Sequence, residues 1–453
     1  WSSSGIVLTL TDTVTAEIEK MDFSCLVRCG SGILRGQILE VPRFGVLSFH
    51  HGDNRVNRGG PSGFWEVLYK EPSSGFIIQA LNNELDGGAV LVRGNIMTAN
   101  RWISNNARLL EKSNIFFMNL LDKIAINEEL PKAEIPILRD RQLYKIDKAD
   151  ILLKYLICVI LPLSIKKIVN RIFSPKVTRW GVSYSMHNGF SKSLWRYREI
   201  NNPKGRYLAD PFVISREGRD IIFVEDFFYS DKKGRISAIE IYGDSHKFLG
   251  VVLEEDFHLS YPFVFESSGE LYMIPESHAA NEIRLYECIE FPMKWRLKKI
   301  LMKNVCAADS MVINKNDTWF LFSNICSAKL GDHNSELHIF HSKDLLHGQW
   351  EPLKTGNPVI FDSERARNGG FFEFAGELYR VNQVHGKAHY GKAFGINKIT
   401  NLNLENYCEK RVKTVRPLFK EGLTGAHHFS SNKKFATFDY SRKVRLKDVL
   451  SEK

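Results

Sequence analysis

The sequence lacks the patterns that mark several common classes of protein. Its seven cysteines are scattered over 453 residues without a C-x-x-C pair, unlike a secreted disulfide scaffold. The net charge of +10 comes without a run of five basic residues and without a zinc-finger, RRM or helix-turn-helix signature, so we expect no nucleic-acid partner. No signal-peptide pattern opens the chain. We therefore expect a protein of a reducing compartment, the cytoplasm.

A membrane-spanning run is also missing. The best candidate, residues 151–165, is interrupted by Lys154 and Pro162 and is shorter than the ~20 apolar residues that a span needs. Basic residues follow it over 166–171. Two interpretations stay open: a helix that lies on an anionic membrane surface, or a buried linker helix.

Length and local amino-acid composition divide the chain into three parts, in keeping with ~100–200 residues per domain. Residues 1–100 are rich in glycine and short strand-like runs, and residues 101–175 carry apolar residues at helical spacing, which predicts a helical connector. From 176 to 445 the sequence is aromatic, β-branched and rich in turns, which is typical of an all-β domain.

This third part contains an internal repeat. Five segments of the form strand, polar turn, strand begin near residues 209, 261, 308, 367 and 427, at intervals close to the ~50 residues of some propeller blades. The repeat predicts a five-bladed β-propeller, and the alternative is a set of sandwich hairpins. Because the last repeat is short, we expect residues 179–189 to supply its missing strand and close the ring.

Acidic residues recur at the strand ends of this repeat. Since innermost strands converge on the propeller axis, we expect Asp210, Glu276 and Asp309 to gather there as catalytic carboxylates. Turn capping and salt bridges are the structural alternative. Candidate substrate-binding residues are Glu225, Asp226, Tyr261, His278, Asn368, His427 and His428. Neither histidine pair, 50–51 or 427–428, lies in a metal-binding pattern, so no metal is predicted.

The segments YPFVFESSGELYMIPES, ADPFV and RNGGFFEFAGELYRV carry a family resemblance. They resemble the propeller-like N-terminal domain of plant glucosamine inositolphosphorylceramide transferases and, more remotely, five-bladed glycoside hydrolases with an Asp at the start of the first blade. The resemblance covers residues 179–442. It implies a carbohydrate-handling module with Asp210 at the matching Asp position, and less directly Glu276 and Asp309.

Residues 45–92, which begin GVLSFHHGDNRV and end NELDGGAVLV, carry a second resemblance. They resemble the second half of the formyltransferase fold of methionyl-tRNA and sugar N-formyltransferases. This implies a partial α/β formyltransferase-like domain using 10-formyltetrahydrofolate, with His50 at the catalytic His position and Asp86 at the Asp position. Ser48 stands where that family has an Asn that stabilises the oxyanion.

Together these observations predict a carbohydrate-active transferase in the assembly of a bacterial surface glycan. Its partners would be a sugar, nucleotide sugar or glycan, with possible peripheral contact with an anionic membrane. The alternatives are a non-catalytic glycan-binding propeller beside a degenerate formyltransferase fold, and a glycoside hydrolase.

Overall fold

A computed structural model describes residues 2–4, 7–30, 32–56, 59–84, 87–136, 143–146, 148–172, 175–186 and 193–451. The chain divides into two compact units. The first comprises Trp1–Ile160 with Ser327–Gly331, and the second comprises Leu161–Cys326 with Asp332–Lys453.

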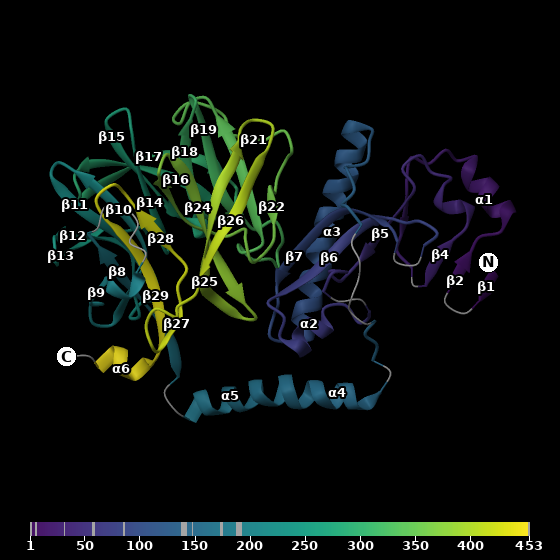
Figure 1. The fold of residues 1–453 in the computed structure, drawn as a ribbon, viewed down its shortest axis with the longest axis horizontal. Helices are drawn as coiled ribbons and strands as arrows, with labels where there is room; N and C mark the ends of the chain where they lie inside the picture. The colour runs from purple at the N-terminus through teal and green to yellow at the C-terminus, as the bar shows by residue number, and fades with distance from the viewer. Residues whose placement is uncertain are drawn as a thin grey trace. The chain divides into compact units, whose positions relative to one another are not determined.

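The second unit contains five antiparallel sheets (Figure 1). The first two are β10–β13 (Arg206–Arg216, Arg219–Phe228, Lys233–Tyr242, Ser245–Leu253) and β14–β17 (Ser260–Ser267, Glu270–Glu276, Glu282–Glu290, Lys294–Lys303). The next two are β18–β22 (Ala307–Lys315, Thr318–Ile325, Glu336–Ser342, Glu351–Pro352, Ile360–Phe361) and β23–β26 (Asn368–Phe374, Glu377–Gly386, His389–Leu402, Tyr407–Val415).

The fifth sheet joins the two ends of this unit. It contains β27 (Leu423–Gly425), β28 (Phe429–Ser431) and β29 (Ala436–Arg445) from the end of the chain, with β8 (Lys176–Ser185) and β9 (Arg198–Ile200) from before the first blade. Strand β8 pairs with β29 along its whole length. The prediction that this segment completes the last blade is confirmed for its described residues, and the pairing covers an edge that would otherwise be open.

The sheets form a closed ring through their first strands. Strand β10 contacts β14, β14 contacts β18, β18 contacts β23, β23 contacts β28, and β28 contacts β10. These strands are therefore innermost, and the sheets form the five-bladed propeller expected from the repeat.

The packing explains why the sequences of these strands are continuous runs of apolar residues. On β11, Ile221 and Phe223 belong to the core shared with the second blade, whereas Ile222 and Val224 belong to the core shared with the fifth. Successive side chains point to opposite faces of a sheet, and here both faces are buried.

The first unit has two small sheets. One contains β1 (Ser2–Ser4), β2 (Val7–Thr9) and β4 (Ile33–Arg35), near helix α1 (Asp12–Glu19); the other contains β3 (Leu26–Arg28), β5 (Val46–His50), β6 (Ser73–Ala80) and β7 (Ala89–Met97). Helix α2 (Phe64–Tyr69) lies between β5 and β6 in sequence, and the long helix α3 (Trp102–Asn127) packs against β6 and β7.

Helix α4 (Ala149–Tyr155), a π-helical turn (Leu156–Ile160) and helix α5 (Leu161–Ile172) follow one another. Val159 is the one buried residue among their described side chains. Most of the large apolar side chains of this segment are exposed, which contradicts the buried-linker interpretation, although Ile151, Ile160 and Leu163 are half-buried. Among the residues that the structure describes, no helix is long and apolar enough to cross a membrane.

Candidate functional site at the propeller centre

A β-bulge recurs in the innermost hairpin of the first four blades, between residues 209 and 212, 260 and 263, 308 and 311, and 368 and 371. In three blades its first residue is Asp210, Tyr261 or Asp309, with φ of 48°, 48° and 46°. This left-handed conformation costs a non-glycine residue about 1–2 kcal/mol. Such strain is concentrated at functional sites, where it aims a side chain.

The strand register places further acidic side chains beside these bulges. Glu225 pairs with Ala209 in the first blade, and Glu276 pairs with Ser260 in the second. Both carboxylates are buried, as are Asp210 and Asp309. The repeat therefore brings together four acidic groups, which we call the central acidic cluster: Asp210, Glu225, Glu276 and Asp309.

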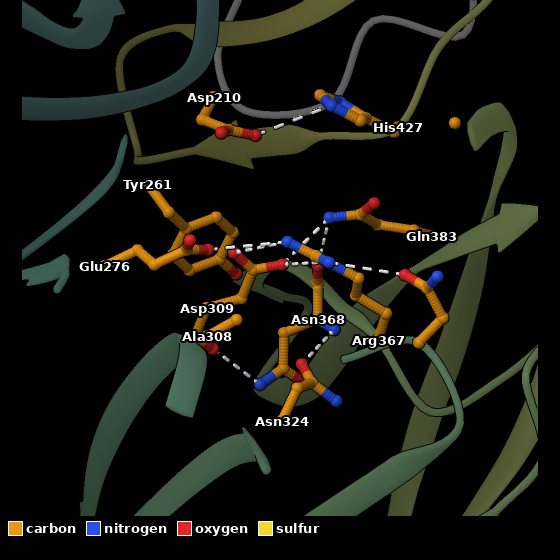
Figure 2. Close-up of polar contacts among 12 residues, drawn as sticks. Asp210, Tyr261, Glu276, Ala308, Asp309, Asn324, Arg367, Asn368, Gln383 and His427 are labelled. Atoms are coloured by element: carbon orange, nitrogen blue, oxygen red, sulfur yellow. Dashed lines mark hydrogen bonds and ion pairs between the residues drawn. The ribbon is translucent and has the colours of Figure 1, made fainter. Parts of the chain in front are cut away.

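Arg367 links two members of the cluster (Figure 2). Its Nε donates to Asp309 Oδ2 at 2.7 Å, and its Nη2 lies 3.4 Å from Glu276 Oε2. Gln383 donates its amide to the same Asp309 oxygen at 2.9 Å. The guanidinium also lies 5.2 Å from the centre of the Tyr390 ring.

The sequence analysis missed Arg367 as a site residue. The signal was present, because Arg367 directly precedes the first strand of the fourth repeat. The register places Leu208, Leu259 and Ala307 at the corresponding positions of the other blades. A single cation at an otherwise apolar position of a repeat points to a local acidic partner.

Asp210 lies on the other side of the cluster, beside His427 (Figure 2). Their closest atoms, Asp210 Oδ1 and His427 Nδ1, are 3.8 Å apart, and the same nitrogen lies 2.6 Å from Asp439 Oδ2. The His427 ring stacks on Trp180, with ring centres 3.8 Å apart. Burial opposes its protonation, but the charges of Asp439 and Asp210 raise the pKa of His427.

Burial separates the acidic groups into two protonation classes. It raises the pKa of Asp210 to about 7, against the opposing charge of His427. It also raises the pKa of Glu225 and of Asp309 well above their usual range, and the neighbouring carboxylates add to the shift. These three groups therefore tend to hold a proton.

Glu276 is the ionised member. Burial alone would raise its pKa, but the hydrogen bond with His278 and the charge of Arg367 outweigh burial and lower it below its usual range. His278 Nδ1 lies 2.7 Å from Glu276 Oε1, and this contact raises the pKa of the imidazole. Protonated carboxyls thus lie beside an ionised one, the arrangement that acid–base chemistry on sugars uses.

The expectation that Asp226 joins this cluster is wrong. It follows Glu225 on β11, so its side chain points to the opposite face. Its Oδ2 accepts hydrogen bonds from Arg206 Nη1 at 2.8 Å and from Ser237 Oγ at 2.7 Å. Asp226 therefore joins strands within the first blade.

Three other predicted residues surround the cluster. The fully buried His428 packs against the rings of Phe212 and Tyr261, which also contact each other. The Tyr261 hydroxyl contacts Met311 Sδ at 2.9 Å. Asn368 donates its side-chain amide to the backbone oxygen of Asp309 at 2.8 Å, which fixes the bulge.

Asp210, His427 and Asp439 also offer one potential ligand atom each within 4.8 Å of one another, a spacing that a metal ion could use. Two of these atoms already form the 2.6 Å contact between His427 and Asp439. The backbone N–H groups of His427 and His428 both donate to Asp439 Oδ1. An ion-paired and hydrogen-bonded group accounts for this geometry.

In the first unit, Ser48 and His50 are two residues apart on β5 and thus face the same side of the sheet. Ser48 is buried, and its hydroxyl lies 3.3 Å from the Phe49 carbonyl oxygen. Asp86, the third residue of the predicted formyltransferase site, lies outside the described residues.

A ring of five antiparallel sheets with an acidic cluster on the innermost hairpins defines a β-propeller protein. The family model "Glucosamine inositolphosphorylceramide transferase 1, N-terminal" matches residues 195–430, and the chain belongs to this family. The resemblance inferred for the propeller from its sequence motifs is thereby confirmed.

Two plant proteins illustrate the relationship. The chain is 34% identical to glucosamine inositolphosphorylceramide transferase 1 of Arabidopsis thaliana over 234 residues, 49% of this chain and 30% of that protein. It is 36% identical to the protein of the same name from Oryza sativa subsp. japonica over 208 residues, 45% and 27% of the two chains. The chain thus matches less than a third of the length of these relatives.

Solved structures similar to this chain include two glycoside hydrolases. The catalytic domain of Coprinopsis cinerea GH62 alpha-L-arabinofuranosidase has a TM-score of 0.37 at 13% identity, over 58% of this chain and 96% of that one. A thermostable family-43 glycoside hydrolase has a TM-score of 0.39 at 14% identity, over 54% and 91%.

Proposed function

We propose that the propeller is a carbohydrate-active transferase module and that the central acidic cluster binds the sugar and supplies acid–base catalysis. The observation that carries this proposal is that one buried cluster holds both Asp210, whose pKa is raised to about 7, and the ionised Glu276. The names of the plant relatives support transfer as the reaction and glucosamine as the sugar class.

Asp210 is the proposed acid–base group. A carboxyl that titrates near neutral pH can give a proton to a departing glycosidic oxygen or take one from an attacking hydroxyl. His427, which is in contact with Asp439, is the ionisable group next to Asp210. Positioned general acid–base catalysis contributes ~100- to 10,000-fold in rate, which sets the expected loss when Asp210 is neutralised.

Arg367 and His278 are the proposed positioning groups. Arg367 fixes Asp309 and Glu276 at once, and His278 holds Glu276 in its ionised form. The His278 side chain is about one-third exposed, and the Tyr390 ring against Arg367 is exposed to a similar extent. Aromatic and imidazole groups at the solvent-facing side of an acidic cluster suit a sugar ring and its hydroxyls.

A direct test compares the chain with Asp210→Asn and with Asp317→Asn, an exposed turn residue of the third blade. Binding of glucosamine, N-acetylglucosamine and their nucleotide-linked forms is measured by calorimetry, and transfer is measured with a labelled donor. We expect Asp210→Asn to bind sugar but to lose at least 100-fold in turnover, and Asp317→Asn to match the parent chain.

The alternatives give different results in the same experiment. A glycoside hydrolase would release labelled sugar into water without an acceptor. A non-catalytic binder would retain sugar and show no turnover in any variant. If no carbohydrate binds the parent chain, the proposal for the propeller is wrong.

For the first unit, we propose formyl transfer to a sugar amine from 10-formyltetrahydrofolate. The formyltransferase segment that residues 45–92 resemble has the order strand, Gly/Pro turn, helix, strand. Here β5, a glycine-rich turn, α2 and β6 follow one another in that order, and Ser48 and His50 share one face of β5. An imidazole on that face would stabilise the oxyanion formed when an amine attacks the formyl carbon. The bacterial glycan expected from the sequence stays a prediction.

A further inference from the structure

Helix α5 separates apolar from basic side chains around its axis. Leu161, Ile165 and Ile168 follow one another at i, i+4 and i+7, so they lie on one face. Each is at least half exposed to solvent. Lys166 and Lys167 are exposed as well and fall on the remaining circumference. The helix is therefore amphipathic, with its apolar face turned away from any described core.

The residues directly before α5 in the sequence also include exposed apolar side chains. Four more large apolar residues of α4 and the π-helical turn are about half exposed: Leu152, Leu153, Leu156 and Ile157. Soluble proteins rarely show so many large apolar side chains in one stretch unless that stretch binds something. No described helix is long and apolar enough to span a bilayer, so a surface-lying orientation is the one that buries these side chains.

A basic cavity of about 670 Å³ lies beside α5. Figure 1 shows α5 leading into β8 and the short helix α6 (Leu446–Ser451) following β29. The cavity is lined by Lys166, Val169 and Asn170 of α5 with Lys176, Lys443, Arg445 and Lys447. Within the part of the chain that the structure describes, its lining includes no acidic side chain.

The surroundings of the cavity disfavour the charge of one of these cations, Lys443. Burial and the neighbouring charge of Lys166 both lower the pKa of Lys443. Like charges around one cavity are costly unless an anion offsets them, and phosphate oxygens are among the ligands that lysine and arginine bind well. The cavity is therefore complementary to a phosphate group.

We propose that α5 lies on an anionic lipid bilayer, with its apolar face among the acyl chains and a lipid phosphate in the basic cavity beside it. The apolar face and the cavity belong to the same helix, so one orientation on the membrane serves both. Stable attachment to a membrane surface needs two weak contributions acting together, because an apolar face or a basic cluster alone binds only marginally. This proposal does not depend on sugar transfer.

The test is sedimentation of the full chain with vesicles of phosphatidylcholine alone or mixed in equal parts with phosphatidylserine. We expect binding to the mixed vesicles, weak binding to the neutral ones, and release at high salt, because the basic contribution is screened over ~8–10 Å at physiological ionic strength. Inorganic phosphate at millimolar concentration should not release the protein, since it cannot replace the apolar contact.

Two variants separate the contributions. Lys166→Glu with Lys167→Glu should weaken binding by at least tenfold, whereas the matched reversal Lys433→Glu with Lys434→Glu, on exposed residues of the fifth blade, should leave it unchanged. Ile165→Glu should abolish binding at any salt concentration. Circular dichroism of each variant checks that the fold is kept.

Three outcomes would overturn the proposal. Equal binding to neutral and anionic vesicles would exclude the headgroup site, and failure to bind either would exclude the membrane. If the parent chain is a dimer that Ile165→Glu converts to a monomer without any vesicle binding, the apolar face is covered by a second copy of the chain instead.

Discussion

Asp210 and Asp309 occupy the same position of a β-bulge in the first and third blades, both in the left-handed backbone conformation. Tyr261 holds this position in the second blade. The carboxylates differ in their partners, because Asp309 is bound by Arg367 whereas Asp210 faces His427. The repeated β-bulge thus places two acids that have the same backbone geometry but different electrostatic surroundings.

The first prediction concerns pH and stability. In the native state Asp210 holds its proton up to a pH of about 7, while an unfolded aspartate releases it near pH 4. The contribution of Asp210 to the unfolding free energy is therefore fully present below about pH 4 and is lost as the pH rises through 7. Asp210→Asn removes that loss. In urea unfolding, we expect the unfolding free energy of the variant, relative to that of the parent chain, to rise by roughly 1–3 kcal/mol between pH 4 and pH 8. A constant difference across this range would contradict the raised pKa.

The second prediction concerns the link made by Arg367. Arg367→Met leaves Asp309 and Glu276 buried without their shared cation, which should cost about 3–5 kcal/mol in unfolding free energy. Adding Glu276→Gln should recover part of this loss, because Glu276 is the ionised member of the cluster and its uncompensated charge is removed.

The matched control for that change is Arg219→Met. Arg219 makes a bidentate pair with Glu240, but its side chain is about one-third exposed, so its loss should cost about 1 kcal/mol or less. Equal losses in the two variants would show that the pair of Arg367 and Asp309 behaves as a surface ion pair.

The third prediction concerns closure of the ring. Val182 on β8 is fully buried, opposite Asp439 of β29. Val182→Ala should lower the unfolding free energy by roughly 2 kcal/mol, through lost transfer energy and the cavity left behind. Val412→Ala removes the same methyl groups from a 59% exposed site and should cost little. Thermal melts of both variants measure the difference, and two equal melting temperatures would mean that β8 is not docked in solution.

The fourth prediction concerns formyl transfer. His50→Ala should abolish formylation of an amino sugar from 10-formyltetrahydrofolate, and Ser48→Asn should raise the rate by restoring an oxyanion donor. His347→Ala, at an exposed residue of the propeller, is the control for loss of an imidazole. A parent chain that binds no folate and gives no formylated product would reject formyl transfer for this unit.

The propeller could be predicted from sequence because its evidence is periodic and local. Each blade repeats an apolar strand, a polar turn and a second apolar strand, and the shortness of the last repeat pointed to the strand now seen as β8. The positions of Asp210, Glu276 and Asp309 followed from the same periodicity, since equivalent positions of a closed ring meet at its axis.

What the sequence could not decide is which polar side chains at the propeller centre pair with one another. Arg367 reaches Glu276 and Asp309 across the ring, and His427 takes Asp439 as its closest partner. The register of β11 turns Asp226 away from the cluster, and the packing of α5 leaves its apolar face in solvent. Sequence periodicity thus determined the blades and the acids on their innermost hairpins. Protonation and pairing depend on burial and on distances between residues far apart in the chain, so only the tertiary structure decided them.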